Sequence, residues 1–212
     1  MEQVLLTSAY LGPLNYYGKM LMADQVLIEQ YDSYHKQTWR NRCRIMAANG
    51  PLDLSVPVVK KSGQKMLMKE VEIDYSTRWQ ANHWRSLLAA YASSPFFEFY
   101  EDDFRPFYEK KWSFLIDFNQ EINACVCNLL ELPVPLGLSD SFVVPEERPG
   151  DFRFNISPKS SHEADPLFQP VEYYQIFDEK YGFVPNMSIV DLLFNTGPEA
   201  LLVLEESVKA NG

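Results

Sequence analysis

A short basic segment, residues 31–45, carries the side chains best suited to hold an anion. Its sequence, YDSYHKQTWRNRCRI, contains one lysine, three arginines and one histidine. If residues 38–46 form a strand, Arg40, Arg42 and Arg44 lie on one face, because side chains alternate along a strand. Three adjacent guanidinium groups repel one another unless carboxylates or an anionic ligand lie against them. The segment therefore predicts a clamp for phosphate or carboxylate groups.

The same charges have two interpretations. In the first, Lys36 and the arginines hold an anionic donor while Asn41 holds a sugar hydroxyl. In the second, the segment is a solvated strand face whose cations pair with some of the chain's 29 aspartates and glutamates. A formal net charge of −10 disfavours a nucleic-acid partner, because phosphate backbones need a large basic surface. A small anion, such as a nucleotide-sugar or an acyl donor, is the expected ligand.

His83 is a candidate general base. It shares an apolar helical face with Trp79 and Leu87, where a lone histidine is more often a hydrogen-bonded core residue than a catalyst. Its titration range, which spans neutral pH, would nevertheless suit proton transfer. His35, next to Lys36, is the alternative base.

Asp191 has a structural and a catalytic interpretation. Ser188 followed by Asp191 approximates a capping box, and an acid in the first turn of a helix suits the helix dipole. A helix N-terminus can also hold an anion. In that case Asp191 or Asn186 would orient a sugar hydroxyl or the catalytic histidine.

Tyrosines supply candidate stacking surfaces. Tyr10, together with Tyr173 and Gln175, would line a pocket for a sugar or a base. Most aromatic side chains in a chain of this composition are simply part of the core, so both interpretations stay open.

The elements that must position these residues begin with a predicted βαβ unit. Apolar residues 4–7 and 25–29 read as strands, and the run 14–23 between them reads as a helix. Such a unit makes the two strands parallel. Ligands of open α/β sheets bind beyond the carboxyl ends of the strands, which points to residues 10–15 and 31–36.

The remaining pattern predicts an α/β fold, or α+β if the opening crossover is misread, with a mixed sheet in one domain spanning residues 1–212. Residues 39–74 read as an antiparallel meander with a turn at Asn49-Gly50. The second half is mainly helical. We expect helices over 78–92, 111–132, 188–195 and 198–208, two short aromatic turns at 96–100 and 104–108, and strands at 139–144, 151–156 and 171–177. Half of the chain's 14 prolines fall in 133–170, which we expect to be an irregular elaboration.

Several function classes are disfavoured by what the sequence lacks. The three cysteines show no zinc spacing, and no glycine-rich phosphate loop occurs, so no metal or cofactor is expected. The start lacks the basic flank of a signal peptide, and no apolar run approaches the ~20 residues needed to span a bilayer. We therefore expect a cytoplasmic chain; the oligomeric state stays open.

Ordered motifs along the chain resemble the WbqC-like protein family. The family's opening YLP-x-x-x-YF pattern is similar to residues 9–17, and its K-x-x-[WY]-x-N-R motif fits Lys36, Trp39, Asn41 and Arg42. A W-x-x-x-H motif fits Trp79 and His83. The last block, residues 183–198, reads FVPNMSIVDLLFNTGP and is the closest match. Between Leu138 and Tyr173 this chain lacks the YLSG-like segment of longer members.

The resemblance implies a role near the synthesis of O-antigen and other surface glycans. On this basis we expect a transferase-like enzyme that modifies an activated sugar by acyl or aminoacyl transfer. Lys36, Arg40 and Arg42 would bind the anionic donor and His83 would take a proton. The alternative is a non-catalytic protein that binds an anionic ligand or acts as a scaffold, which the missing segment favours.

Overall fold

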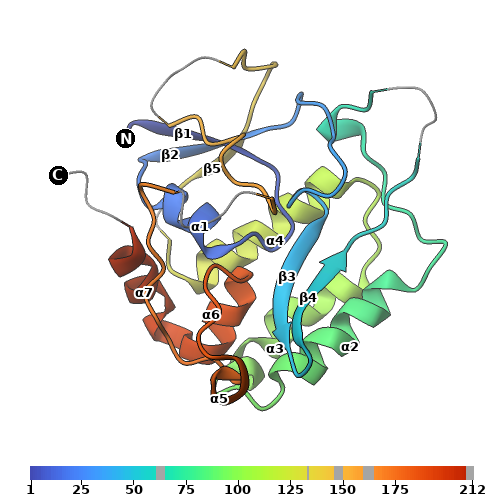
Figure 1. The fold of residues 1–212 in the computed structure, drawn as a ribbon. Helices are drawn as coiled ribbons and strands as arrows, with labels where there is room; N and C mark the ends of the chain where they lie inside the picture. Colours follow the sequence, from blue (N-terminus) through green and yellow to red (C-terminus); the bar gives the residue numbers. More distant parts are fainter. Residues whose placement is uncertain (61–64, 133, 146–149, 160–164, 209–212) are drawn as a thin grey trace.

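A buried parallel sheet opens the chain. The computed structural model describes residues 1–60, 65–132, 134–145, 150–159 and 165–208. Strand β1 (Gln3–Thr7) leads through helix α1 (Leu14–Met20) to strand β2 (Gln25–Glu29), and the two strands pair in parallel. Strand β5 (Leu136–Leu138) pairs with the other edge of β2 (Figure 1). The predicted βαβ unit is therefore confirmed.

The antiparallel strands form a sheet of their own. Strands β3 (Arg42–Ala47) and β4 (Gly50–Ser55) pair as a hairpin, with Ala47 opposite Gly50. The turn is therefore one residue earlier than predicted, and Gly50 adopts a positive φ of 101° at the start of β4. Instead of one mixed sheet, the described residues hold a parallel sheet and a separate hairpin, and the α/β class is confirmed.

The third strand of the predicted meander is not formed. Residues Met68–Glu70 make a 3-10 turn, η1, and among the described residues the chain that follows pairs with the segment after β4 in an isolated bridge between Val58 and Ile73. Alternation of apolar and acidic residues there still buries Val71 and Ile73. The pattern indicated the buried face correctly but not the continuous ladder.

Three helices follow in the chain, and the first of them packs against β3 of the hairpin. Helices α2 (Trp79–Tyr91) and α4 (Leu115–Leu129) lie where periodicity predicts them. Helix α3 (Phe97–Glu109) replaces the two predicted aromatic turns and carries Pro106 inside it. The sequence predicted two separate turns here, but burial of Phe97, Phe104 and Tyr108 along one side stabilises a continuous helix.

The last third of the chain is more irregular than predicted. The three strands expected in this part are not formed in the described residues of 139–144, 151–156 and 171–177. One isolated parallel bridge joins Leu5 to Asp151. Residues 133, 146–149 and 160–164 of the proline-rich elaboration lie outside the described residues. The chain closes with four short elements: α5 (Asp178–Tyr181), α6 (Ile189–Thr196), η3 (Gly197–Glu199) and α7 (Ala200–Ser207).

Gly197 ends α6 in a conformation that only glycine adopts without strain. Its φ is +57°, and a β-carbon there would overlap the ring of Phe96. Gly182 has a similar φ of +67°, but a β-carbon there would meet no atom within 4 Å. An alanine at Gly182 would therefore suffer backbone strain alone, whereas an alanine at Gly197 would suffer both strain and steric overlap.

We expect Gly197→Ala to lower the free energy of unfolding by about 3 kcal/mol, because it adds overpacking to backbone strain. Gly182→Ala is the matched control and should cost about 1 kcal/mol from strain alone. Urea unfolding monitored by circular dichroism measures both. Equal losses in the two variants would show that the Phe96 ring moves aside at no cost.

Candidate functional site

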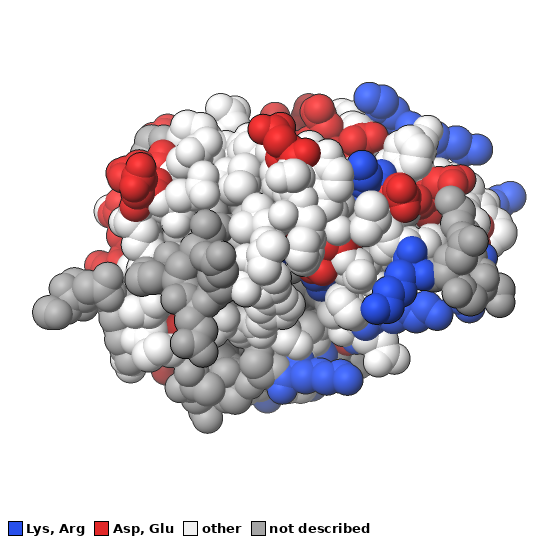
Figure 2. Space-filling model, turned by 90° about the horizontal axis from the view of Figure 1, so that it is seen from above, with Lys and Arg blue, Asp and Glu red and all other residues white. Residues whose placement is uncertain are grey.

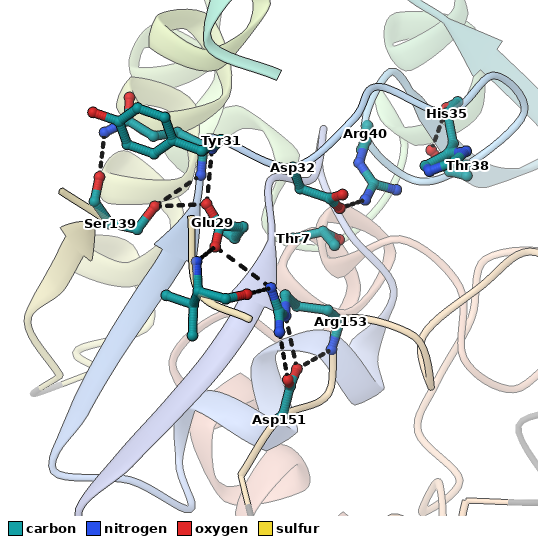
Figure 3. A network of polar contacts seen from close by, with 12 residues as sticks. Thr7, Glu29, Tyr31, Asp32, His35, Thr38, Arg40, Ser139, Asp151 and Arg153 are labelled. Carbon is teal, nitrogen blue, oxygen red and sulfur yellow. Dashed lines mark hydrogen bonds and ion pairs between the residues drawn. The ribbon is translucent and has the colours of Figure 1, made fainter. Parts of the chain in front are cut away.

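Buried charges gather at the carboxyl ends of the parallel strands (Figure 3). Glu29, the last residue of β2, is 1% exposed. Its carboxylate accepts hydrogen bonds from the Tyr31 backbone N–H (2.8 Å), the Ser139 hydroxyl (2.8 Å) and the Val143 backbone N–H (2.8 Å). Three donors, one from the chain after β2 and two from the chain after β5, thus stabilise the ionised carboxylate at the end of the sheet.

Arg153 completes this network. Its guanidinium donates to both carboxylate oxygens of Asp151 at 2.9 and 2.7 Å, to the Val143 carbonyl at 2.8 Å and to Glu29 at 3.4 Å. The side chains of Arg153 and Glu29 are both 0% exposed. The network therefore holds residues 151–153 against the sheet, with every charged side chain in it engaged by another group of the chain.

Arg40 does not share the predicted arginine face. The strand begins at Arg42, and Arg40 lies in the preceding turn, where it is buried and its Nη2 contacts the Asp32 carboxylate at 2.5 Å. Burial lowers the pKa of this guanidinium, and the nearby Asp32 offsets part of that effect. The prediction of three guanidiniums on one strand face was wrong, because the turn directs the first of them inward.

Arg42 and Arg44 do lie on one face of β3, opposite the buried Cys43 and Ile45. Both contact a single carboxylate: Asp53 accepts from Arg42 at 3.1 Å and from Arg44 at 2.7 and 3.2 Å. Asp53 sits directly across the hairpin from Arg44. The carboxylate of Asp53, a residue of the chain itself, therefore lies where the sequence suggested the anionic group of a ligand.

Three lysines surround a separate cavity, which we call the lysine pocket. It measures about 630 Å³ and is formed by the segment after β2 and the segment after β4. Its lining residues are Asp32, Ser33, Tyr34, His35, Lys36, Val58, Val59, Lys60, Lys65 and Met66. Figure 2 shows lysine and arginine side chains lying mostly on the right half of the face seen from above.

The sequence indicated only part of the lysine pocket. Lys36 was among the expected ligand-binding residues, and His35 was the alternative base. Lys60 and Lys65 were missed, although they lie in a lysine-rich run of the sequence, VVKKSGQK, at residues 58–65. Lys61, in the same run, lies outside the described residues. A second basic run close to a turn was the signal that would have found them.

His83 lies in the protein interior and does not line the lysine pocket. Its Nδ1 is 3.0 Å from the Tyr10 hydroxyl, which is 2.9 Å from the Tyr108 hydroxyl, and its ring packs edge-on against Trp79. The Ser55 backbone accepts a further hydrogen bond from the imidazole. Burial lowers the pKa of His83 to about 4, so the ring is neutral at pH 7.

Asp191 is also fully buried, but in a different network. Its carboxylate accepts hydrogen bonds from the hydroxyls of Tyr91 (2.7 Å) and Tyr173 (2.6 Å) and from the Gln175 amide (2.7 Å). Burial raises the pKa of this carboxyl, and the three donors counteract the shift. Tyr173 and Gln175, expected as pocket residues, therefore hold Asp191. The predicted capping box is absent, because the Ser188 hydroxyl donates to the Leu11 carbonyl instead.

The fold does not bring the two predicted catalytic residues into one hydrogen-bond network. His83 and Tyr91, the tyrosine that contacts Asp191, are eight residues apart on α2, which corresponds to about 12 Å along the helix axis. One network lies near the start of the helix and the other near its end.

The two predicted asparagines make backbone contacts. The Asn41 amide donates to the Val56 carbonyl at 2.8 Å. Asn186, at a φ of +55°, accepts a hydrogen bond from the Asn15 backbone N–H at 2.9 Å, which satisfies a free donor in the first turn of α1. Within the described residues no group of three or more histidine, cysteine or acidic side chains is placed to hold a metal ion.

Comparison with known proteins identifies the family. The model of the WbqC-like protein family matches residues 8–164 and 160–203. This chain belongs to the WbqC-like protein family. A relative of the WbqC-like chain, Uncharacterized protein Rv1507c of Mycobacterium tuberculosis, is 26% identical over 218 residues, covering 92% of this chain and 94% of the relative. No solved structure matches this WbqC-like chain.

The opening motif and the last motif of the WbqC-like chain, residues 9–17 and 183–198, contact each other. The Leu14 N–H donates to the Met187 carbonyl at 3.1 Å, and the Ile189 N–H donates to the Gly12 carbonyl at 2.9 Å. Together with Asn186, these bonds attach the last motif to the opening loop. None of the helices in the described part of the chain is long and apolar enough to cross a bilayer.

We expect the His83 imidazole to titrate near pH 4 rather than near its ordinary pKa of about 6.5. Between these values the unfolded chain binds more protons than the folded one, so stability falls as the pH is lowered. Wild type should lose about 3 kcal/mol more than His83→Gln between pH 6.5 and 4. Imidazole NMR titration and urea unfolding test this; an imidazole titrating near pH 6.5 would contradict it.

Arg153→Met should lower the free energy of unfolding by about 3–5 kcal/mol, because it leaves the carboxylates of Glu29 and Asp151 buried without their cation. Lys159→Met, on an exposed side chain in the same segment, is the control and should change stability little. Urea unfolding at pH 7 measures both. A small loss for Arg153→Met would mean that water reaches the network.

Proposed function

We propose that this WbqC-like chain binds a small anionic ligand in the lysine pocket. The supporting observation is that Lys36, Lys60 and Lys65 line one cavity of about 630 Å³. That volume lies within the ~300–1,000 Å³ range of small-molecule sites. A nucleotide-sugar or an acyl donor has a phosphate group for the lysines and a body that the cavity can accommodate.

The location of the pocket supports the same proposal. Asp32 and Ser33 follow directly after the carboxyl end of β2, where ligands of parallel sheets gather. Asp32, which forms part of the pocket wall, pairs with the buried Arg40, and this ion pair fixes the chain that carries Lys36. The lysines are exposed, so they keep their mobility and can adapt to a phosphate group.

The reaction that suits this pocket is acyl or aminoacyl transfer to an activated sugar during surface-polysaccharide or O-antigen synthesis, as the family resemblance implies. A sugar hydroxyl or amine would attack the carbonyl carbon of the donor, and the donor's leaving group would depart. We propose His35 as the base that takes the released proton, because it lines the pocket whereas His83 is buried elsewhere. Such transfer depends mainly on placement and one base, and we propose that it takes place in the cytoplasm.

A non-catalytic binding protein is the second candidate. It is favoured because carboxylates of the chain itself already pair with Arg40, Arg42 and Arg44, which leaves lysines as the pocket's cations. Lysines suffice to bind a phosphate, but they lack the fixed fork that orients one.

Isothermal titration with UDP-glucose and with acetyl-CoA tests the pocket. We expect the double change Lys36→Gln and Lys65→Gln to weaken binding by about tenfold or more, because each lysine contributes a charged hydrogen bond. Lys69→Gln is the matched control, since that lysine lies over the Tyr31 ring outside the pocket. Binding should also weaken with added salt.

Unchanged affinity in the double lysine variant would exclude the lysine pocket as the binding site. Where a ligand binds, His35→Asn separates the two candidates. Transfer product that disappears with this change supports His35 as the base, whereas binding without product in the wild type favours the binding protein.

A further inference from the structure

A second, smaller cavity opens at the start of α2. It measures about 290 Å³, and its wall includes Tyr75, Thr77, Arg78, Trp79, Tyr108 and Lys111. These residues come from the chain before α2 and its first turn, the end of α3 and the chain before α4. We call it the tyrosine pocket; it shares no lining residue with the lysine pocket.

The charge of the tyrosine pocket is positive. Arg78 and Lys111 both contribute to its wall, and neither forms an ion pair with another described residue. The Lys111 ammonium instead lies 5.3 Å from the centre of the Tyr75 ring. Arg78 also precedes the first turn of α2, which has no side-chain cap, so the partial positive charge of the helix end adds to that of the cations.

One polar donor in the wall lacks a partner. Trp79 is 3% exposed, and its indole N–H makes no hydrogen bond within the part of the chain that the structure describes. A buried donor without a partner costs free energy, and tryptophan N–H groups usually find an acceptor. Because this N–H has no exposed surface, the suitability of the cavity for an acceptor-rich guest rests on Arg78 and Lys111, which have no carboxylate partner among the described residues.

We propose that the tyrosine pocket binds an anion carried on a single sugar ring, namely a sugar carboxylate or a sugar phosphate. Arg78 and Lys111 would hold the anionic group, and the flat faces of Tyr75 and Tyr108 would pack against the ring. The Thr77 hydroxyl would bond to a ring hydroxyl. A volume of about 290 Å³ suits one hexose, being at the lower limit of the ~300–1,000 Å³ usual for ligand sites.

The pocket is also connected to His83. Tyr108 is part of its wall, and hydroxyl contacts of 2.9 and 3.0 Å run from Tyr108 through Tyr10 to the imidazole. A guest in the tyrosine pocket is therefore two tyrosine side chains away from the neutral histidine. Binding should change the polarity around Tyr108, and the His83 imidazole resonances should report it. This inference does not rest on ligand binding in the lysine pocket.

The experiment titrates full-length protein with D-glucuronate, glucose 6-phosphate and neutral glucose, by calorimetry and by imidazole NMR. We expect one or both anions to bind and to shift the His83 resonances, and glucose to bind more weakly. The double change Arg78→Gln and Lys111→Gln should weaken anion binding by about tenfold or more. The matched control, Arg85→Gln with Lys110→Gln, changes two exposed cations outside the pocket and should leave affinity unaltered.

The anion that binds decides between a carboxylate and a phosphate guest. Failure of both anions to bind would overturn the proposal, as would full affinity in the Arg78/Lys111 variant. Loss of binding in the Lys36/Lys65 variant would place the anions in the lysine pocket and overturn it as well. Thermal unfolding of each variant checks that the substituted chain is folded, which is expected because all six glutamine positions are exposed.

Discussion

The rest of the structure depends on how buried charges find partners at the carboxyl ends of the parallel strands. Glu29 ends β2 in an interior position, where an ionised carboxylate is stable only with several donors and a cation nearby. Arg153 supplies that cation from far along the chain. This requirement fixes residues 151–153 against the end of the sheet.

The same requirement determines which cations remain for ligands. Arg40 is buried and pairs with Asp32, and the exposed arginines of β3 share Asp53. Among the described residues, Lys36, Lys60 and Lys65 on the neighbouring segments are exposed and can keep their ammonium groups in water. The most basic stretch of the sequence is therefore largely neutralised within the fold, and the cations that face a cavity lie beside it.

Periodicity predicted much of the scaffold, and the reason is local. Continuous apolar runs predicted β1 and β2, and the helical spacing of Trp79, His83 and Leu87 predicted α2. Prediction was wrong at α3, where two short aromatic turns were expected and buried aromatic packing stabilises one continuous helix. It was also wrong at Arg40, because a turn before the strand changed the direction of one side chain.

By itself, the sequence determined the α/β class, the opening crossover, the main helices and the resemblance to a family, since each depends on spacing along a few turns or strands. Only the tertiary structure decided which polar groups meet. Tyr10 reaches His83 across 73 residues and Tyr91 reaches Asp191 across 100. Such contacts result from packing whole elements together, and a side chain's local pattern carries no information about its distant partner.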